Sequence, residues 1–207
     1  QKILALAHVE VLAFVRRIGP LEVPAESLPF HSETSSRILD HWWPLVKSAR
    51  DKSLYRFPLS GLETEAERLA LAAREQGDSW GGSVECWVRG LPAGLGEPVF
   101  DKLGAVLGHA LLSLPAATSF AVGGGHELSR KAGSQSRDPI GPGEHHARPL
   151  GNLHGGLLGG LTTGEPLWMK VDVHAPTSLP QEIASIDLRS GESTTVRVEG
   201  RHDSIPL

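Results

Sequence analysis

The sequence is short of cysteine, of excess positive charge and of long apolar runs, and each shortage excludes a class of protein. Its 207 residues include one cysteine, Cys86, so no disulfide can form within the chain and a reducing, cytoplasmic location is expected. Lysine and arginine number 20 against 24 acidic residues, without the basic surplus that duplex nucleic-acid binders usually show. No run approaches the ~20 apolar residues that a spanning helix needs. We therefore expect neither a nucleic-acid nor a membrane partner.

The remaining composition is that of a globular domain. Hydrophobic residues make up 40% of the chain and charged residues 21%, which is enough to build a sizeable core. We expect a single domain over residues 1–207 with a loop-rich segment at 120–150, where glycine, histidine and polar residues gather. The chain starts with Gln1 and without a secretory signal pattern, so we expect a fragment of a longer protein or a processed chain.

Four stretches predict strands. Apolar and β-branched residues dominate residues 9–18, which end at Gly19-Pro20. Alternating apolar positions predict strands over 83–89 and 167–173, and a weaker one over 194–198. Each of these strands would present one apolar face to a core.

Three stretches predict helices. Thr64 and Glu67 form the pattern of a capping box for a helix over 64–76, and Gly77 is placed to end it. A second helix is expected to open at Pro98, with an apolar stripe of helical spacing reaching to Leu114. A short helix is expected near 33–43, because the prolines between 20 and 58 argue against any long element there. The Trp42-Trp43 pair would anchor that stretch to the core.

Several motifs recur in an order that carries more information than any one of them. They are GDSWGG (77–82), LPAGLGEPVFDKL (91–103), Gly133-Ser134 with Asp138, NLHGGLLGGLTTG (152–164), HAPTS (174–178) and GRHD (200–203). Taken together and in this order, they resemble the chorismate synthase family over nearly the whole chain. The resemblance implies an α/β (α+β type) fold, a β-α-β sandwich with helices packed against antiparallel sheets.

The resemblance also implies a reaction, a cofactor and partners. Family members are phosphate lyases of the shikimate pathway of aromatic amino acid biosynthesis. They convert 5-enolpyruvylshikimate 3-phosphate to chorismate and phosphate by a 1,4-anti elimination. They need reduced FMN, for which NADPH serves some members as reductant, and they form homotetramers. The chain is accordingly expected to be an enzyme of this kind.

Site residues follow from the matching motif positions. The resemblance assigns proton handling with the flavin to Asp203. It assigns flavin contacts, through backbone, hydroxyl and guanidinium groups, to Pro115, Ala116, Gly159, His174, Ala175, Pro176, Thr177, Ser178 and Arg201. No metal site is implied.

The chain also departs from the family pattern. Its counterpart of a flavin-contacting lysine is His174, and the imidazole of the Asn-His-Ala motif lies one residue later, at His154. The family's Gly-Glu-Ser-His and Arg-x-Ser-Ala-Arg-Glu segments, and its terminal helix, have no counterpart in these residues. An alternative is therefore a non-catalytic family member that binds flavin weakly or acts only in assembly, with exposed apolar faces that favour self-association.

Two other kinds of site are weaker alternatives. Gly77–Gly81 fit the Gly-x-Ser-x-Gly nucleophile pattern, but that motif needs a strand before the serine and a helix after it, and the reverse is expected here. A group of loop residues could hold zinc or nickel, although their spacing matches no standard motif: His126, Glu144, His145, His146 and His154. The run 155–164 fits neither the Rossmann nor the P-loop pattern.

Overall fold

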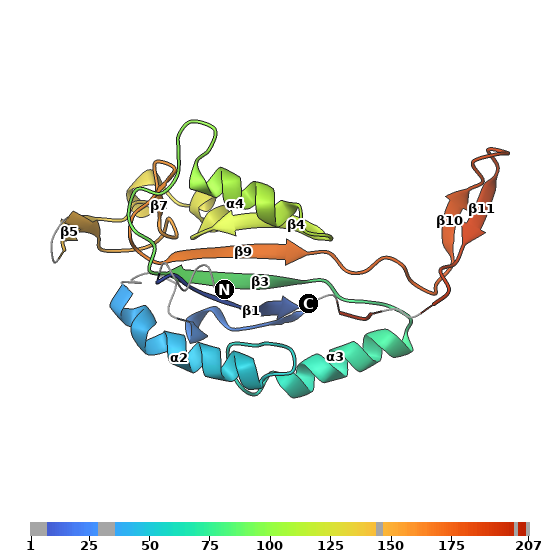
Figure 1. Cartoon of the computed structure of the whole chain (residues 1–207). Helices are drawn as coiled ribbons and strands as arrows, with labels where there is room; N and C mark the ends of the chain where they lie inside the picture. The colour runs from blue at the N-terminus through green and yellow to red at the C-terminus, as the bar shows by residue number, and fades with distance from the viewer. Residues whose placement is uncertain (1–7, 29–35, 144–146, 201–202, 206–207) are drawn as a thin grey trace.

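A five-stranded antiparallel sheet forms the centre of the protein (Figure 1). The computed structural model describes residues 8–28, 36–143, 147–200 and 203–205. The strand order is β2-β1-β3-β9-β4. Its strands are β1 (Glu10–Ile18), β2 (Leu21–Glu22), β3 (Gly82–Arg89), β4 (Ala117–Val122) and β9 (Leu167–Val173). The strands expected near 9–18, 83–89 and 167–173 are confirmed, but they pack side chains into cores on both faces of the sheet instead of one.

Helices cover both faces of this sheet. Helices α2 (Ser36–Lys52) and α3 (Glu63–Glu75) lie along one face, and α4 (Leu103–Leu112) lies on the other (Figure 1). This arrangement of helices against antiparallel strands confirms the expected fold class. The shorter elements are η1 (Ala25–Ser27), η2 (Gly125–Arg130), η3 (Gly133–Gln135), β5 (Ile140–Pro142), β6 (Ala147–Pro149), β7 (Leu157–Leu158), β8 (Leu161–Thr162), β10 (Ile183–Ile186) and β11 (Ser193–Val196).

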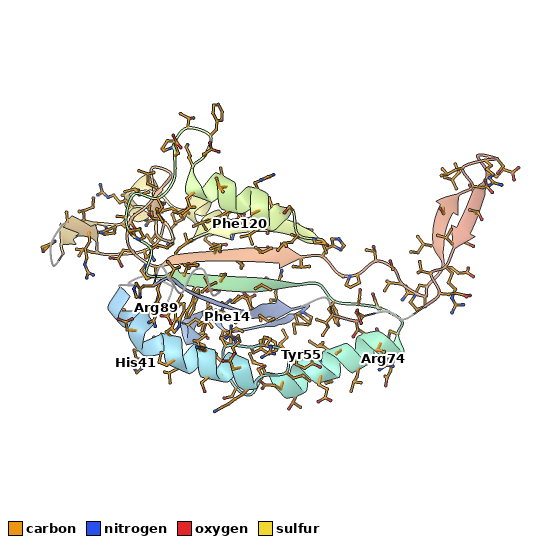
Figure 2. The ribbon with its side chains drawn as sticks, viewed as in Figure 1. Phe14, His41, Tyr55, Arg74, Arg89 and Phe120 are labelled. Atoms are coloured by element: carbon orange, nitrogen blue, oxygen red, sulfur yellow. The ribbon has the colours of Figure 1, made fainter. Side chains whose placement is uncertain are left out.

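The α2/α3 face holds the larger of two hydrophobic cores. Phe14 of β1 and Trp87 of β3 meet edge to face, with ring centroids 4.9 Å apart. Leu39, Trp43 and Val46 of α2 pack against the same cluster, and Phe14 points toward this helix (Figure 2). The spacing of these three residues puts them on one stripe of the helix. The expected anchoring role of the tryptophan pair is thus confirmed.

The α4 face holds a smaller core. Its buried members are Val9, Val88, Leu167 and Met169, and Leu107 and Leu111 of α4 pack against them only in part. Gly108 lets the helix come close to β4, because an added Cβ would lie 3.2 Å from Cδ1 of Phe120. Figure 2 shows Phe120 between α4 and the sheet.

Helix α2 corrects the expectation of a short helix broken by prolines. It runs for 17 residues from Ser36 and contains Pro44. Proline removes one backbone hydrogen bond and crowds the preceding turn. Pro44 lies on the exposed side of the helix, whereas its neighbours Trp43 and Val46 are buried, so packing on the sheet offsets the local cost. Residues 33–35 of the expected helix lie outside the described residues.

The starts of α3 and α4 also differ from the expectation. Helix α3 begins at Glu63, after Leu62, and no side chain caps it. The carboxylate of Glu63 instead accepts a hydrogen bond from the amide of Gly61, so Thr64 and Glu67 form no capping box. Gly77 ends α3 as expected, with its φ of 62° and its amide bonded to the carbonyl of Arg74.

Helix α4 begins at Leu103, five residues after the expected Pro98. The chain first makes a tight turn, in which the amide of Glu97 donates to the carbonyl of Asp101. Residues 120–122 of the expected loop-rich segment 120–150 belong to β4, and Phe120 and Val122 pack on the α4 face. The weak strand near 194–198 is β11, which pairs with β10 in a hairpin extending away from the sheet (Figure 1). No helix of the described ranges is both long and apolar enough to cross a membrane.

Candidate functional site

Most of the expected site residues that the structure describes lie at one end of the central sheet. At this end β3 and β4 begin and β9 ends, and Val173 pairs with both Gly82 and Ala117. We call it the motif end, made up of residues 79–82, 115–117, 174–178 and 203–204. Four sequence segments that are far apart in the chain therefore share one edge of the molecule.

Glycine is required where two of these segments cross. A Cβ at Gly81 would lie 2.6 Å from the carbonyl oxygen of Val173 and 2.8 Å from the amide nitrogen of Ala175. Real side chains do not tolerate such distances to backbone atoms. Gly81 thus allows the backbone after β9 to lie directly against the start of β3.

The turn before β4 is joined to the end of β9 by a hydrogen bond. The amide of His174 donates to the carbonyl of Ala116 over 3.0 Å. Ala116 has a φ of 64°, an uncommon value for a residue other than glycine. The ring nitrogen Nδ1 of His174 lies 2.6 Å from the carbonyl oxygen of Ala175. Two of the expected flavin-contact segments, Pro115-Ala116 and His174–Ser178, are thus in direct contact.

The GDSWGG motif binds the other two segments in place. The hydroxyl of Ser79 donates to the carbonyl of Pro176 over 2.6 Å, and the amide of Trp80 donates to the carbonyl of Ser204 over 2.8 Å. The second bond holds Asp203 beside the motif end, where its side chain is exposed. Thr177 and Ser178 also expose their side chains. Arg201 lies outside the described residues.

Gly159 is the one expected flavin contact that the described structure places elsewhere. It forms the turn between β7 and β8, with a φ of 62° and no atom within 4 Å of an added Cβ. The next residue, Gly160, accepts a hydrogen bond from Leu103 at the start of α4, whereas Pro115 follows the end of that helix. Ten helical residues span about 15 Å, so Gly159 and the motif end lie at opposite ends of α4.

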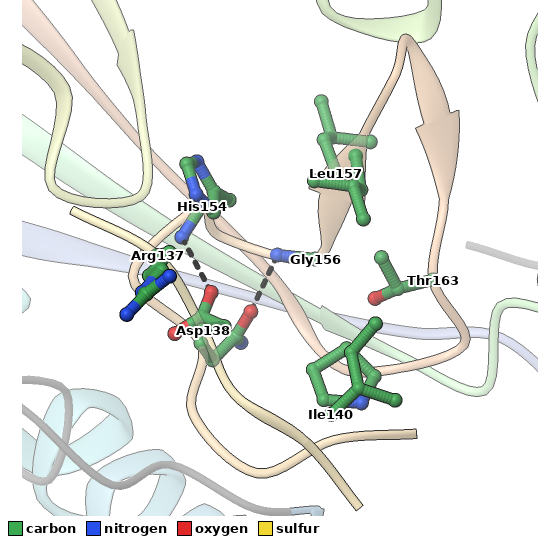
Figure 3. Close-up of a pocket in the computed structure, with 10 residues that line it drawn as sticks. Arg137, Asp138, Ile140, His154, Gly156, Leu157 and Thr163 are labelled. Atoms are coloured by element: carbon green, nitrogen blue, oxygen red, sulfur yellow. Dashed lines mark hydrogen bonds between the residues drawn. The ribbon is translucent and has the colours of Figure 1, made fainter. Parts of the chain in front are cut away.

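A small pocket lies beside this second position (Figure 3). Its volume is about 80 Å³. Asp138 accepts hydrogen bonds from the amides of Leu153 and His154, at 2.9 and 3.2 Å. The side-chain oxygen of Asn152 accepts one from the amide of Gly156 at 2.6 Å. The side chains of Asp138 and Asn152 therefore hold the glycine-rich backbone of residues 153–156 through hydrogen bonds to its amides.

Neither weaker alternative gains support from the geometry. Ser79 follows helix α3 and precedes strand β3, and its hydroxyl is already bonded to a carbonyl, so it is not at a nucleophile elbow. Burial, and secondarily the charge of Glu85, raise the pKa of the Cys86 thiol to about 11, which leaves little thiolate near neutral pH. No group of three or more potential metal ligands occurs among the described residues, and residues 144–146 lie outside them.

Comparison with known proteins identifies the family. The sequence model of the family described as "Chorismate synthase" matches residues 1–206. The chain belongs to the chorismate synthase family. It is 37% identical to the chorismate synthase of Haloquadratum walsbyi over 99% of this chain and 50% of that protein. It is 36% identical to that of Opitutus terrae over all of this chain and 53% of that protein.

A solved chorismate synthase structure has the same fold. It matches with a TM-score of 0.76 and 27% sequence identity, covering 86% of this chain and 52% of that chain. The chain thus spans about half the length of the chorismate synthases it matches. The motif resemblance predicted which segments contact flavin but not the roles of Ser79 and Gly81, which join the start of β3 to residues 173–176. The GDSWGG motif was the available signal.

Proposed function

We propose that this chain contributes the flavin-binding end of a chorismate synthase. The proposed reaction converts 5-enolpyruvylshikimate 3-phosphate to chorismate and phosphate by 1,4-anti elimination. Reduced FMN would supply transient electron density for loss of phosphate, without net oxidation. The observation that supports this most is the meeting of residues 115–116, 174–178 and Asp203 at one end of the sheet.

The groups present at the motif end suit a flavin. Thr177 and Ser178 offer exposed hydroxyls to phosphate or flavin oxygens, and they follow a backbone held in place by Ser79. The exposed carboxylate of Asp203 is expected to hold or move a proton at the reacting atoms. The imidazole of His174 is expected to contact the cofactor, and its Nδ1 lies against the carbonyl of Ala175.

The finer expectations from the family belong to the same proposal. We expect reduced FMN as cofactor, with NADPH as its reductant, and a cytoplasmic homotetramer. Association of two copies would also explain the position of Gly159. The Gly159 end of α4 in one copy could then lie against the motif end of the other copy. The separation of Gly159 equally favours the alternative, a non-catalytic family member that binds flavin weakly or acts only in assembly.

Titration with FMN tests the proposal. We expect saturable quenching of flavin fluorescence that becomes tighter when 5-enolpyruvylshikimate 3-phosphate is added. Replacing both hydroxyls, Thr177→Ala with Ser178→Ala, should weaken FMN binding by about tenfold, roughly the loss of one or two hydrogen bonds. The matched control is Thr194→Ala with Thr195→Ala on β11, where both residues are exposed in the hairpin that extends away from the sheet (Figure 1).

Chorismate formation with chemically reduced FMN then separates the two candidates. Production of chorismate supports the enzyme. Flavin binding by a folded protein that makes no chorismate supports the non-catalytic alternative. A folded protein that neither binds flavin nor makes chorismate would contradict the enzyme and leave a role in assembly alone.

A further inference from the structure

A polar groove crosses the α2/α3 face of the sheet, beside the aromatic core. It has a volume of about 840 Å³, within the range of small-molecule sites. Charged residues from three neighbouring strands line it, with the ring of Trp168 as an apolar wall: Arg16, Glu85, Lys170 and Asp172. We call it the Arg16 groove.

Strand register explains why these charges meet. Glu85 of β3 pairs directly with Lys170 of β9, and Lys170 pairs with Ala121 of β4. Directly opposed residues in antiparallel strands share one face of the sheet. Trp87, two residues after Glu85, shows that this is the face on which the aromatic core lies. Glu85 and Lys170 therefore lie on the same face as the aromatic core and continue it toward β4 with charged side chains.

Arg16 has a side-chain N–H group for which the described residues provide no hydrogen-bond acceptor. Its side chain is 7% exposed, and its Nε lies 3.7 Å from a carboxylate oxygen of both Glu22 and Glu85. Its Nη1 is buried and finds no hydrogen-bond acceptor among the described residues. Buried guanidinium nitrogens normally have acceptors, because an unpaired donor pays its desolvation cost in full.

Lys170 adds a second positive charge, which lies opposite Glu85 on β3 and interacts with that carboxyl electrostatically. Within the described ranges, no carboxylate lies within ion-pairing distance of its ammonium group. The acids that flank it are engaged elsewhere. Asp172 accepts a hydrogen bond from Ser119 at 2.6 Å and pairs with Arg17 at 3.5 Å. Glu85 accepts one from the indole of Trp87 at 2.7 Å.

We propose that the Arg16 groove binds a small molecule through a carboxylate or phosphate group placed between Arg16 and Lys170. A planar guanidinium with a neighbouring ammonium is a common arrangement for such oxyanions. Trp168 would pack against the rest of the ligand. The groove begins at Ser119 and Asp172 and runs away from residues 174–178, so the ligand is distinct from the flavin proposed above.

Calorimetric titration of the purified protein with inorganic phosphate, and separately with malonate, tests this proposal at constant ionic strength. We expect saturable binding of at least one of the two, and which one binds identifies the ligand's anionic group. Lys170→Met should weaken that binding by at least about tenfold, since it removes one of two charge-assisted contacts. Lys47→Met, on the exposed side of α2, is the matched control and should leave it unchanged.

Two further measurements keep the test decisive. Arg16→Lys keeps the charge but replaces the planar guanidinium and its several N–H donors by a single ammonium nitrogen. It should weaken binding while circular dichroism remains that of the folded protein. The indole N–H signal of Trp168 should shift on addition of the anion. Absence of saturable binding to either anion, equal binding by the Lys170→Met variant, or full displacement by FMN would overturn the proposal.

Discussion

The two faces of the central sheet differ in how completely they are covered. On the α2/α3 face, Phe14, Trp87 and their neighbours are buried by two helices that together supply 30 residues, 17 from α2 and 13 from α3. On the α4 face a single ten-residue helix covers a core with four buried members. One sheet thus carries a closed core on one side and a partly open one on the other.

The open side is apolar as well as thinly covered. In α4 the residues Leu103, Val106, Leu107, Leu111 and Leu112 surround the helix, and Gly108 is its one buried residue. Val106 and Leu112 are each 47% exposed. A helix that is apolar on all sides is normally buried between two layers. The α4 face therefore has the properties of an interface, whereas the α2/α3 face is a closed core over β1 and β3 that opens along the Arg16 groove.

The largest expected effect tests the closed core. Trp87→Ala should lower the free energy of unfolding by about 3–5 kcal/mol, because it removes a fully buried ring that contacts Phe14 and leaves a cavity. Urea denaturation followed by circular dichroism measures this change.

Leu54→Ala provides the control, because its side chain is 79% exposed and should change stability by no more than about 0.5 kcal/mol. If both variants lost similar stability, the α2/α3 face would not be the main source of stability.

A substitution on the α4 face should have a smaller effect on the free energy of unfolding. Leu107→Ala removes a side chain of α4 that packs only in part against the smaller core. We expect a loss of about 1–2 kcal/mol in the free energy of unfolding, below the range for fully buried leucines. A loss as large as that of Trp87→Ala in the same urea series would mean that the two faces are equally important.

How far the sequence predicted these features depends on the range of the interactions. The strands β1, β3 and β9 follow from local alternation, and Gly77 from the backbone geometry of a helix end. Helix α2 was underestimated because the buried positions of Trp43 and Val46, which outweigh the cost of Pro44, depend on a sheet that the local pattern does not show. The start of α4 was placed too early because Pro98 precedes a turn closed by Glu97 and Asp101.

The candidate site shows the same limit. Motif resemblance named residues 115–116 and 174–178, and their contact through His174 and Ala116 agrees with that grouping. It gave no indication that Gly159 lies at the other end of α4, because the length of a helix separates positions that a list of motifs places together. Nor did it single out Arg16 and Lys170, which lie on β1 and β9, on either side of β3, and line one groove only because of the strand order.

The exposed side of α4 offers a test with little effect on stability. Replacing Val106→Ser together with Leu112→Ser should change the free energy of unfolding by about 0.5 kcal/mol per site or less, because both side chains are half exposed. The same double variant should reduce self-association, measured by sedimentation velocity, since it removes apolar area from the proposed interface. A variant that associates as strongly as the parent would show that α4 is not the interface.

The smallest expected effect concerns Glu85, a buried acid on the closed face. Burial in this face raises the pKa of the Glu85 carboxyl, despite the indole of Trp87 and the charge of Arg16, which act in the other direction. A raised pKa in the folded state means that the folded protein binds the proton more tightly than the unfolded chain does. The stability contributed by the protonated group is complete below the ordinary glutamate pKa of about 4.3 and is lost as pH rises through the higher folded value.

The free energy of unfolding of the parent should therefore fall, relative to that of Glu85→Gln, as pH rises from about 4.3 toward neutrality. The glutamine keeps an oxygen that can accept the hydrogen bond from Trp87 but has no proton to lose, so the difference between the two profiles isolates this carboxyl. Thermal unfolding at several pH values measures both. Parallel profiles would mean that Glu85 titrates as in the unfolded chain, and hence that water reaches the carboxyl and the polar edge of the closed core is as open as the α4 face.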